Sequence, residues 1–159
     1  MHDCGFTHEN NWFRYRAAAL IIENDCLLFV GNEKENYYYS VGGGVHMGET
    51  AKDAVIREVY EETGVNYEID RLAIIHENFF NQHSGGLKGL NCHEICFYFL
   101  MKSKGSQKLK NKMTQDSKEE LYWLPINKLD KYNTFPKFFK DYFNKNHSEV
   151  VHIITDDRK

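Results

Sequence analysis

The chain has 159 residues, 42% of them hydrophobic, so it can bury one good core but is too short for two ordinary domains. Its formal net charge of -3 argues against nucleic acid held by a broad basic surface, so a bound anion should bring a cation with it. We expect a single domain over residues 1–159, with a flexible N-terminus over residues 1–11 and a C-terminal tail over residues 150–159.

The sequence also argues against secretion and membrane insertion. The N-terminus has no apolar segment of the kind that signal peptides carry, and the longest apolar run, residues 17–22, is far shorter than a membrane span. The cysteines, Cys4, Cys26, Cys92 and Cys96, are too few and too scattered for a disulfide framework. We therefore expect a cytoplasmic protein with reduced thiols.

The first part of the chain predicts strands and turns. Residues 16–22 and 26–30 are apolar runs joined by Glu-Asn-Asp, which indicates a hairpin. Residues 32–36 form a polar loop, and residues 37–41 return to an extended segment that ends at a run of glycines.

A helix is predicted next, between Thr50 and Gly64. Thr50 followed by Asp53 resembles a capping box with a shorter acid, and Gly64 supplies the left-handed residue that commonly ends a helix. Val55 and Val59 share one side of this helix and can pack against a sheet.

The second half alternates strand-like and irregular segments. Residues 67–80 are mostly strand-like, and residues 94–101 predict an aromatic strand after a glycine-rich loop. Residues 102–118 are the most loop-like part of the chain, and residues 120–124 predict a final strand.

The C-terminal part predicts one more helix. Pro125 marks the end of the last predicted strand, and Pro136 stands where a proline is tolerated in the first turn of a closing helix that runs to Asn144. The final residues either add an edge strand or remain a tail.

Three acids crowd one face of the first predicted helix. Glu58, Glu61 and Glu62 are spaced i, i+3, i+4 and fall within an arc of roughly 100°. A solvated helix face is the ordinary explanation. However, two carboxylates about 6 Å apart repel by roughly 3 kcal/mol at an effective dielectric of 20, so a partly enclosed set has reason to bind a cation. Oxygen donors favour Mg²⁺, with Mn²⁺ as a substitute, and Mg²⁺ often shares its coordination with substrate phosphates.

The glycines before the helix permit a close approach of backbone to a metal or a phosphate. Gly42, Gly43, Gly44 and Gly48 have no Cβ that would obstruct such an approach, although a flexible turn is the commoner meaning of clustered glycine.

Together these residues resemble a known signature. Gly43, five residues, Glu49, seven residues, then Arg57-Glu58-Val59-x-Glu61-Glu62-x-Gly64-Val65 is similar to a complete Nudix box, the signature of the Nudix hydrolase superfamily. The box covers residues 43–65. Val41 departs from the common form, which has a proline before the glycine pair, and this should alter the rigidity of the turn more than the chemistry.

The resemblance implies an α/β fold, an α/β/α sandwich with a mixed β-sheet between helices. It also implies Mg²⁺-dependent hydrolysis of the pyrophosphate bond of a small molecule, a nucleoside diphosphate linked to another group. An NDP-sugar such as ADP-ribose and a nucleoside triphosphate are both reasonable substrates. A homodimer is an option because dimers are the commonest oligomers.

The resemblance further implies roles for the acidic residues of the box. Glu58 and Glu62 would be the principal metal ligands, Glu61 a further ligand or a water-positioning group, and the carbonyl of Gly42 an additional ligand. Two or three cations would polarise the phosphoryl oxygens and lower the pKa of the attacking water.

The other box residues would support these ligands. Arg57 would orient Glu58 by a charge-assisted hydrogen bond. Gly43, Gly44 and Glu49 would form the phosphate loop, with Glu49 supporting the loop or reaching a second metal.

The general base comes either from the box or from outside it. Glu94 is our outside candidate, because it lies on an alternating apolar strand that puts Cys92, Glu94, Cys96 and Tyr98 on one face. Glu77 is a weaker candidate by the same reasoning.

Other residues have competing interpretations. Cys92, His93 and Cys96 suggest zinc, but no second pair completes a tetrahedral set, and buried thiols are the better interpretation. Tyr39, Phe79 and Phe80 could stack on a base, although aromatic residues make up 14% of the chain and most must be core. The lysines within residues 102–112 could clamp a polyphosphate, but a solvated loop is favoured.

Two other classes of function remain. One is a non-catalytic nucleotide-binding regulatory module, against which the intact acids count. The other is a diphosphate isomerase, in which a cysteine and a glutamate would act on the hydrocarbon portion. Product analysis separates both from a hydrolase.

Overall fold

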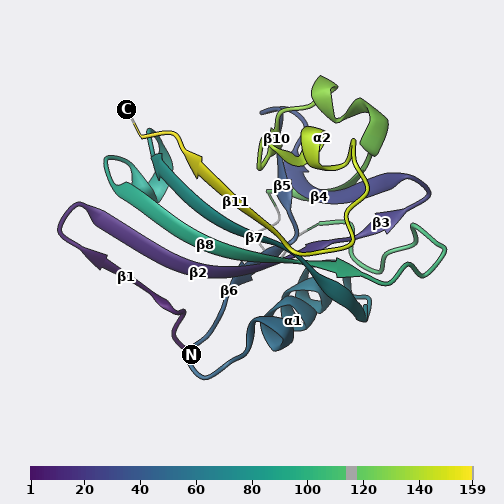
Figure 1. Ribbon diagram of the computed structural model, residues 1–159, viewed down its shortest axis with the longest axis horizontal. Helices are drawn as coiled ribbons and strands as arrows, with labels where there is room; N and C mark the ends of the chain where they lie inside the picture. Colours follow the sequence, from purple (N-terminus) through teal and green to yellow (C-terminus); the bar gives the residue numbers. More distant parts are fainter. Residues whose placement is uncertain (114–117, 159) are drawn as a thin grey trace.

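The computed structural model describes residues 1–113 and 118–158, and it contains two mixed β-sheets (Figure 1). The first sheet has six strands in the order β1-β2-β8-β7-β11, with β6 also paired to β2. Its strands are β1 (Gly5–His8), β2 (Asn11–Leu20), β6 (Gly42–Gly44), β7 (Ile69–Asn81), β8 (Asn91–Met101) and β11 (Val151–Asp156). The pairs β2/β8 and β7/β11 are parallel and the other pairs are antiparallel, so the sheet is mixed.

The second sheet has five strands and is also mixed. Its order is β10-β5-β4-β3, with β9 also paired to β4. Its strands are β3 (Ile22–Glu23), β4 (Cys26–Asn32), β5 (Tyr37–Ser40), β9 (Glu120–Pro125) and β10 (Thr134–Phe135). Only the pairing of β10 with β5 is parallel.

The helices are few. They are α1 (Ala51–Thr63), the short α2 (Phe139–Tyr142) and the 3-10 segments η1 (Gly85–Leu87) and η2 (Ile126–Lys131). In Figure 1, α1 lies on one side of the six-stranded sheet, while α2 lies with the second sheet. The predicted α/β fold with a mixed sheet and helices is confirmed, with two sheets in place of one. Among the described residues, no helix has the length and apolar character needed to cross a membrane.

The hairpin of residues 16–30 forms with a tighter turn than predicted. Glu23, the last residue of β3, pairs with Cys26, the first residue of β4, and the turn consists of Asn24 and Asp25, with φ of 51° and 59°. Two positive φ values are typical of a type I′ turn, whose twist matches that of the strands it joins.

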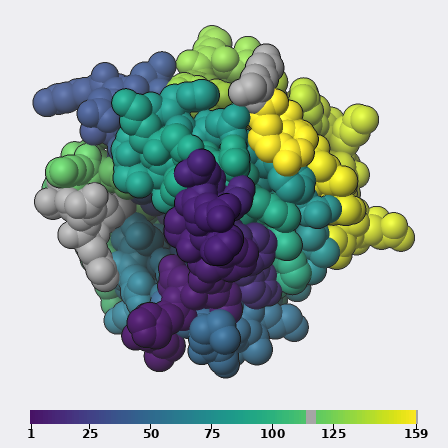
Figure 2. All heavy atoms as spheres, turned by 90° about the vertical axis from the view of Figure 1, so that its left-hand side faces the viewer, coloured from purple at the N-terminus to yellow at the C-terminus, as the bar shows by residue number. Residues whose placement is uncertain are grey.

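The N-terminal residues pair with the six-stranded sheet, and the flexibility expected over residues 1–11 stays a prediction. Strand β1 pairs with β2, Cys4 N donates to Val45 O at 2.7 Å, and Met47 N donates to His2 O at 2.8 Å. In the side view of Figure 2, the N-terminal segment lies between the start of the box and the loop that joins β7 to β8. These backbone hydrogen bonds involve distant residues, which a local pattern does not reveal.

The C-terminal prediction needs one correction. The closing helix expected from Pro136 to Asn144 is only the four residues of α2, which bury Phe139 and Tyr142. Of the two alternatives for the final residues, the edge strand is the one that forms, since β11 pairs parallel to β7. The loop predicted over residues 102–118 lacks helix and strand where it is described, and residues 114–117 lie outside the described residues.

The core has two parts that meet at the six-stranded sheet. One part lies under α1, where Val55 and Val59 are fully buried as predicted. The other lies between the two sheets and includes Phe29 and Phe139, whose rings are 6.1 Å apart. Burial on both faces fixes β2, β7 and β8 as the rigid floor for the residues described next.

Candidate active site

Helix α1 begins and ends as its sequence predicts. The Asp53 N–H donates to Thr50 Oγ1 at 3.1 Å, and Gly64, with φ of 72°, donates its N–H to Tyr60 O at 2.8 Å. Both contacts satisfy backbone groups that a helix end leaves without partners. With its ends fixed, α1 holds Glu58, Glu61 and Glu62 in a constant relation to the glycine segment.

Arg57 joins the helix to the turn before it. Its Nε and Nη2 donate to the two carboxylate oxygens of Glu49 at 2.8 and 2.9 Å, and its Nη1 donates to Glu58 Oε1 at 2.5 Å. Nη2 also donates to the carbonyl of Gly44 at 3.1 Å. The hydrogen bonds from Arg57 lower the pKa of Glu49 to about 2, and the same pair raises the pKa of Arg57. The sequence-based contact of Arg57 with Glu58 is present, and Glu49 lies where it supports the loop.

The glycine segment is a strand, not a free turn. Strand β6 pairs with β2, with Gly43 opposite Ala17 and Gly42 opposite Ala18. A Cβ on Gly43 would lie 2.5 Å from the carboxylate of Glu58. The absence of a side chain at Gly43 therefore lets the Glu58 carboxylate lie against the backbone.

Glu62 is the least satisfied acid of the helix. Its Oε2 is buried and has no hydrogen-bond partner among the described residues. Burial, together with the charges of Glu58, Glu119 and Glu61, raises the pKa of Glu62 to about 7. A buried carboxylate oxygen without a donor, among other carboxylates, is a site that a divalent cation would fit.

The carboxylates are not arranged as a finished metal centre. Within residues 1–113 and 118–158, no three His, Cys, Asp or Glu side chains converge as a group that could hold a metal ion. Glu58 is instead turned toward Arg57, and the side chain of Glu61 is 41% exposed. The donor set still consists of oxygens alone, which suits a hard cation better than zinc.

Glu119 joins this acidic group and was missed in the sequence. Tyr37 donates its hydroxyl to Glu119 Oε1 at 2.8 Å, and Tyr39 donates to Glu119 Oε2. The two tyrosine rings are parallel within 9°, and burial, followed by the hydrogen bond to Glu119, raises the pKa of Tyr39. Glu119 comes just before β9, and only the pairing of β9 with β4 brings it near the box, so no local motif marks it.

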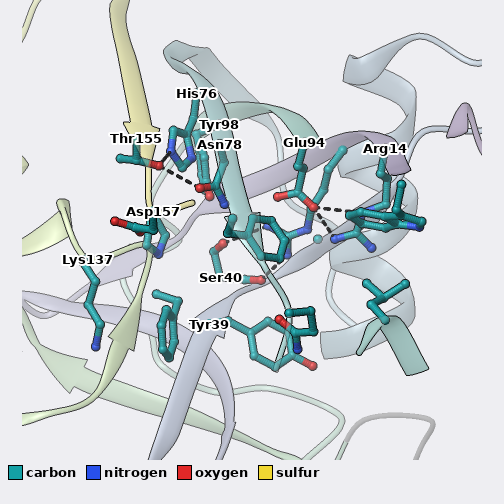
Figure 3. A pocket seen from close by; sticks show the side chains of 18 residues that line it. Arg14, Tyr39, Ser40, His76, Asn78, Glu94, Tyr98, Lys137, Thr155 and Asp157 are labelled. Atoms are coloured by element: carbon teal, nitrogen blue, oxygen red, sulfur yellow. Dashed lines mark hydrogen bonds and ion pairs between the residues drawn. The ribbon is translucent and has the colours of Figure 1, made fainter. Parts of the chain in front are cut away.

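A cavity of about 710 Å³ lies over the six-stranded sheet, beside the glycine segment (Figure 3). Strands β2, β5, β7, β8 and β11 contribute to its wall, and Gly42, Tyr39, Phe80 and Glu94 are among the lining residues. None of the box glutamates is among the described residues that line it. The candidate site thus has an acidic helix on one side of Gly42 and a cavity on the other.

The outside candidates for the general base lie on opposite faces of the sheet. Glu94 faces the cavity, and its Oε2 accepts from Arg14 Nε at 2.9 Å and Nη2 at 2.6 Å. Glu77 lies beside a second cavity on the other face and contacts His152 Nε2 at 2.7 Å. Glu94 therefore remains the better placed of the two.

The aromatic candidates are also divided. Phe80 lines the cavity, whereas Phe79 stacks on His93 with ring centroids 4.3 Å apart and is not among the described lining residues. Adjacent residues of a strand point to opposite faces, so only one of this pair could face the cavity. The same alternation takes His93 away from Cys92 and Cys96, which are buried free thiols.

Arg16 is a second residue that sequence reasoning missed. It is 7% exposed, and its Nη2 and Nη1 donate to the carbonyl of Ser40 at 2.7 Å and to Ser40 Oγ at 3.2 Å. Burial acts to lower the pKa of Arg16, but the contacts with Cys96 and Glu94 outweigh it and raise the pKa. Its place in an apolar strand, between Tyr15 and Ala17, was the available signal.

Fold and site together define an α/β protein of two mixed sheets whose acidic helix follows a glycine segment. A MutT protein of Bacillus halodurans has the same fold, with a TM-score of 0.67 at 17% identity over 90% of each chain. A family model described as the NUDIX domain matches residues 12–153. The chain therefore belongs to the Nudix family.

Relatives with curated names differ in what they act on. Diphosphoinositol polyphosphate phosphohydrolase 2 of Homo sapiens is 35% identical over 93 residues, 56% of this chain and 52% of that protein. An RNA pyrophosphohydrolase of Francisella philomiragia is 27% identical over 154 residues, 86% of this chain and 99% of that protein. The chain matches only about half the length of the diphosphoinositol enzymes.

Proposed function

We propose that the protein is a Nudix-type pyrophosphohydrolase that requires Mg²⁺, with Mn²⁺ as a substitute, and that cleaves a nucleotide containing a diphosphate. The observation that carries this proposal is the buried oxygen of Glu62, which has no described donor and lies among the charges of Glu58, Glu61 and Glu119. The names of the diphosphoinositol polyphosphate phosphohydrolase and the RNA pyrophosphohydrolase support the class of reaction, because both describe hydrolysis at phosphorus.

Glu58, Glu61 and Glu62, with the carbonyl of Gly42, are the groups that would hold the cation. When bound there, the cation supplies Lewis-acid polarisation of the phosphoryl oxygens and lowers the pKa of a bound water. The raised pKa of Glu62 has the same origin as this affinity, since burial and neighbouring carboxylates penalise its charged form.

The protein's own residues orient this acidic group. Arg57 holds Glu58 at its Oε1 and Glu49 at both oxygens, which fixes the helix against the loop. Tyr37 and Tyr39 hold Glu119 from the second sheet. Ordered carboxylates lose little freedom when a substrate arrives, which favours a productive geometry.

Glu94 is proposed as the general base. Both of its hydrogen bonds from Arg14 fall on Oε2, so Oε1 is the oxygen left to accept a proton from water. Glu119 is the competing candidate because its charge acts on Glu62 directly.

The experiment is a substrate panel assayed with Mg²⁺, with Mn²⁺ and with a chelator. The panel contains nucleoside triphosphates, ADP-ribose, a 5′-triphosphorylated RNA and a diphosphoinositol polyphosphate. We expect metal-dependent release of phosphate-containing fragments from at least one nucleotide. A rearranged diphosphate would indicate an isomerase, and binding without turnover would indicate a regulatory module; either result contradicts the proposal.

Glu62→Gln is the variant that tests the cation site. We expect a loss of activity beyond about 100-fold, because even residues that only support metal ligands are worth 10–100-fold. Glu68→Gln is the matched control, since Glu68 is an exposed acid paired with Lys102 and lies outside the site. Equal activity in the two variants would remove Glu62 from the mechanism.

A further inference from the structure

A chain of hydrogen bonds in the cavity wall fixes the orientation of Asn78. Thr155 on β11 stands opposite Asn78 on β7, and its Oγ1 donates to Asn78 Oδ1 at 2.7 Å. His76 Nε2 is 2.8 Å from the same Thr155 oxygen. A hydroxyl has one proton to give, so with Thr155 donating to Asn78, His76 must be the donor to Thr155.

The buried state of His76 is consistent with this direction. The side chain is 2% exposed, and burial lowers the pKa of His76 to about 4, so the ring is neutral at pH 7. A neutral imidazole with its proton on Nε2 is a donor at Nε2 and has a lone pair at Nδ1, and Nδ1 has no partner among the described residues.

This series of hydrogen bonds does not use the NH2 group of Asn78, which therefore faces the cavity. Turning the amide over would make Thr155 donate to His76 Nε2, which moves the His76 proton to Nδ1, where it would be a buried donor without a partner among the described residues. In Figure 3, Asn78 and Thr155 lie together on one side of the cavity, opposite Glu94 and Arg14. Asn78 is therefore presented as a hydrogen-bond donor.

Asp157 provides an acceptor beside this donor. It lies two residues after Thr155, where a strand returns to the same face, and its N–H donates to Phe79 O at 2.8 Å. Asp157 and Phe80 both line the cavity, and Figure 3 places the Asp157 side chain next to Thr155. A donor, a two-oxygen acceptor and an aromatic ring are the groups that recognise the edge and face of a nucleobase.

The charges of the lining argue against a densely phosphorylated ring. Its cationic residues are Arg14, Arg16 and Lys137, and its anionic residues are Glu94 and Asp157. Glu94 already neutralises Arg14. Because each phosphate monoester carries about -1.5 to -2 charges at pH 7, a ring with several phosphates would face nearly as many anions as cations.

We propose that this cavity is a base-recognition site for a nucleotide with a lactam edge, guanine above all, and that Asn78 held by Thr155 and His76 is the specificity-determining donor. The proposal rests on the proposed function, since it identifies the base of the nucleotide that is hydrolysed. The Asn78 NH2 group donates to O6, and the two oxygens of Asp157 accept from N1–H and the exocyclic amine.

Other bases satisfy fewer of these groups. Hypoxanthine lacks the exocyclic amine and leaves one oxygen of Asp157 without a partner. Adenine offers one amine and one ring nitrogen that accepts. It therefore also leaves one oxygen of Asp157 without a donor, and its accepting ring nitrogen lies toward the Asp157 carboxylate. Each unpaired group weakens binding by about 10-fold or more.

The test measures binding of GMP, IMP, AMP and inositol hexakisphosphate to the metal-free protein by calorimetry. These compounds need no hydrolysis, so a protein that lacks the proposed activity still gives a result. We expect IMP to bind about 10-fold more weakly than GMP, AMP to bind more weakly still, and inositol hexakisphosphate to bind more weakly than GMP. Equal affinity for GMP and AMP, or tighter binding of inositol hexakisphosphate, would overturn the inference.

Variants of the hydrogen-bond chain extend this test. Asn78→Asp replaces the donor by an acceptor and should abolish the preference for GMP. Thr155→Val should reduce the preference, whereas Thr155→Ser keeps the hydroxyl and should restore it. Ile154→Ala is the control, because Ile154 is 61% exposed on the same strand and is not among the lining residues.

The two proposals can fail separately. Metal-dependent hydrolysis of nucleotides without a base preference would keep the pyrophosphohydrolase and refute the role of Asn78. A preference for GMP without hydrolysis of any nucleotide would keep the base site and refute the enzyme. Melting curves of each variant show whether it still folds. If Asn78→Asp does not fold, the comparison of the GMP preference in Thr155→Ser and Thr155→Val decides the outcome.

Discussion

The acidic helix and the cavity wall use charge in opposite ways. Around α1, Glu49, Glu58 and Arg57 form ion pairs at a partly exposed surface, and Glu62 is left with an unsatisfied oxygen. In the cavity wall, His76 is neutral and its polar contacts end at Asn78. The first arrangement suits a group that binds a cation, and the second suits a group that must present one fixed hydrogen-bond donor.

This difference in the use of charge assigns the proposed hydrolysis to the acidic helix and the proposed recognition of the base to the cavity wall. Gly42 lines the cavity and belongs to the strand that leads into α1, so it lies between the two regions. A change on the helix should lower turnover for every substrate, whereas a change in the wall should alter the ranking of substrates. The following experiments test that division.

The largest effect is expected from Glu94, which lies in the wall but is proposed to act in the reaction. Glu94→Gln should lower kcat by about 10²–10⁴-fold, because a general base typically contributes that much. The measurement is kcat and KM for the best substrate of the panel, with Glu119→Gln measured in parallel. If Glu119→Gln shows the loss in kcat and Glu94→Gln changes only KM, then Glu119 is the base and Glu94 belongs to recognition.

A smaller effect is expected from Arg57, which positions acids without touching the substrate. Arg57→Lys keeps the charge but cannot hold Glu49 and Glu58 at once, so kcat/KM should fall by about 10–100-fold for all substrates. A loss for one base only would contradict the division between the regions. Lys52→Arg, on the same helix, is the control.

The sequence revealed the helix region because its contacts are local. Thr50, Asp53 and Gly64 mark the helix within fourteen positions, and Arg57 contacts residues no more than thirteen positions away. The spacing of Glu58, Glu61 and Glu62 follows from helix geometry alone.

The residues of the cavity wall could not be predicted from the sequence in the same way. Arg14 and Glu94 are 80 positions apart, and His76 and Thr155 are 79 apart, so only strand pairing brings them together. The alternation of strand β8 did identify Glu94 correctly as facing the same side as Cys96 and Tyr98. It could not show that β2 and β11 would complete the wall, because pairing over such distances leaves no local pattern.

The smallest expected effect concerns the pH dependence of stability, and it arises from His76. Burial lowers its pKa from 6.5 to about 4, with Glu94 raising it and Arg16 lowering it to a lesser degree. Between those values the unfolded chain binds a proton that the folded chain does not, so the stability from neutral His76 is present above pH 6.5 and is lost as the pH falls toward 4. Between pH 7 and pH 5 the loss is on the order of 2 kcal/mol, or about 4–8 °C in Tm.

His76→Gln should remove this slope, because glutamine keeps a polar side chain but does not titrate. Other groups change in the same range, and Glu62, whose pKa is raised to about 7 by burial and neighbouring acids, gains stability as the pH falls. The contribution of Glu62 is present in the unchanged protein and in His76→Gln alike. The difference in Tm between these two proteins, compared at pH 7 and at pH 5, therefore isolates the contribution of His76. If the difference in Tm between the two proteins were the same at pH 7 and pH 5, His76 would have the same pKa in the folded and unfolded states. That result would contradict a neutral His76 in the hydrogen-bond chain to Asn78.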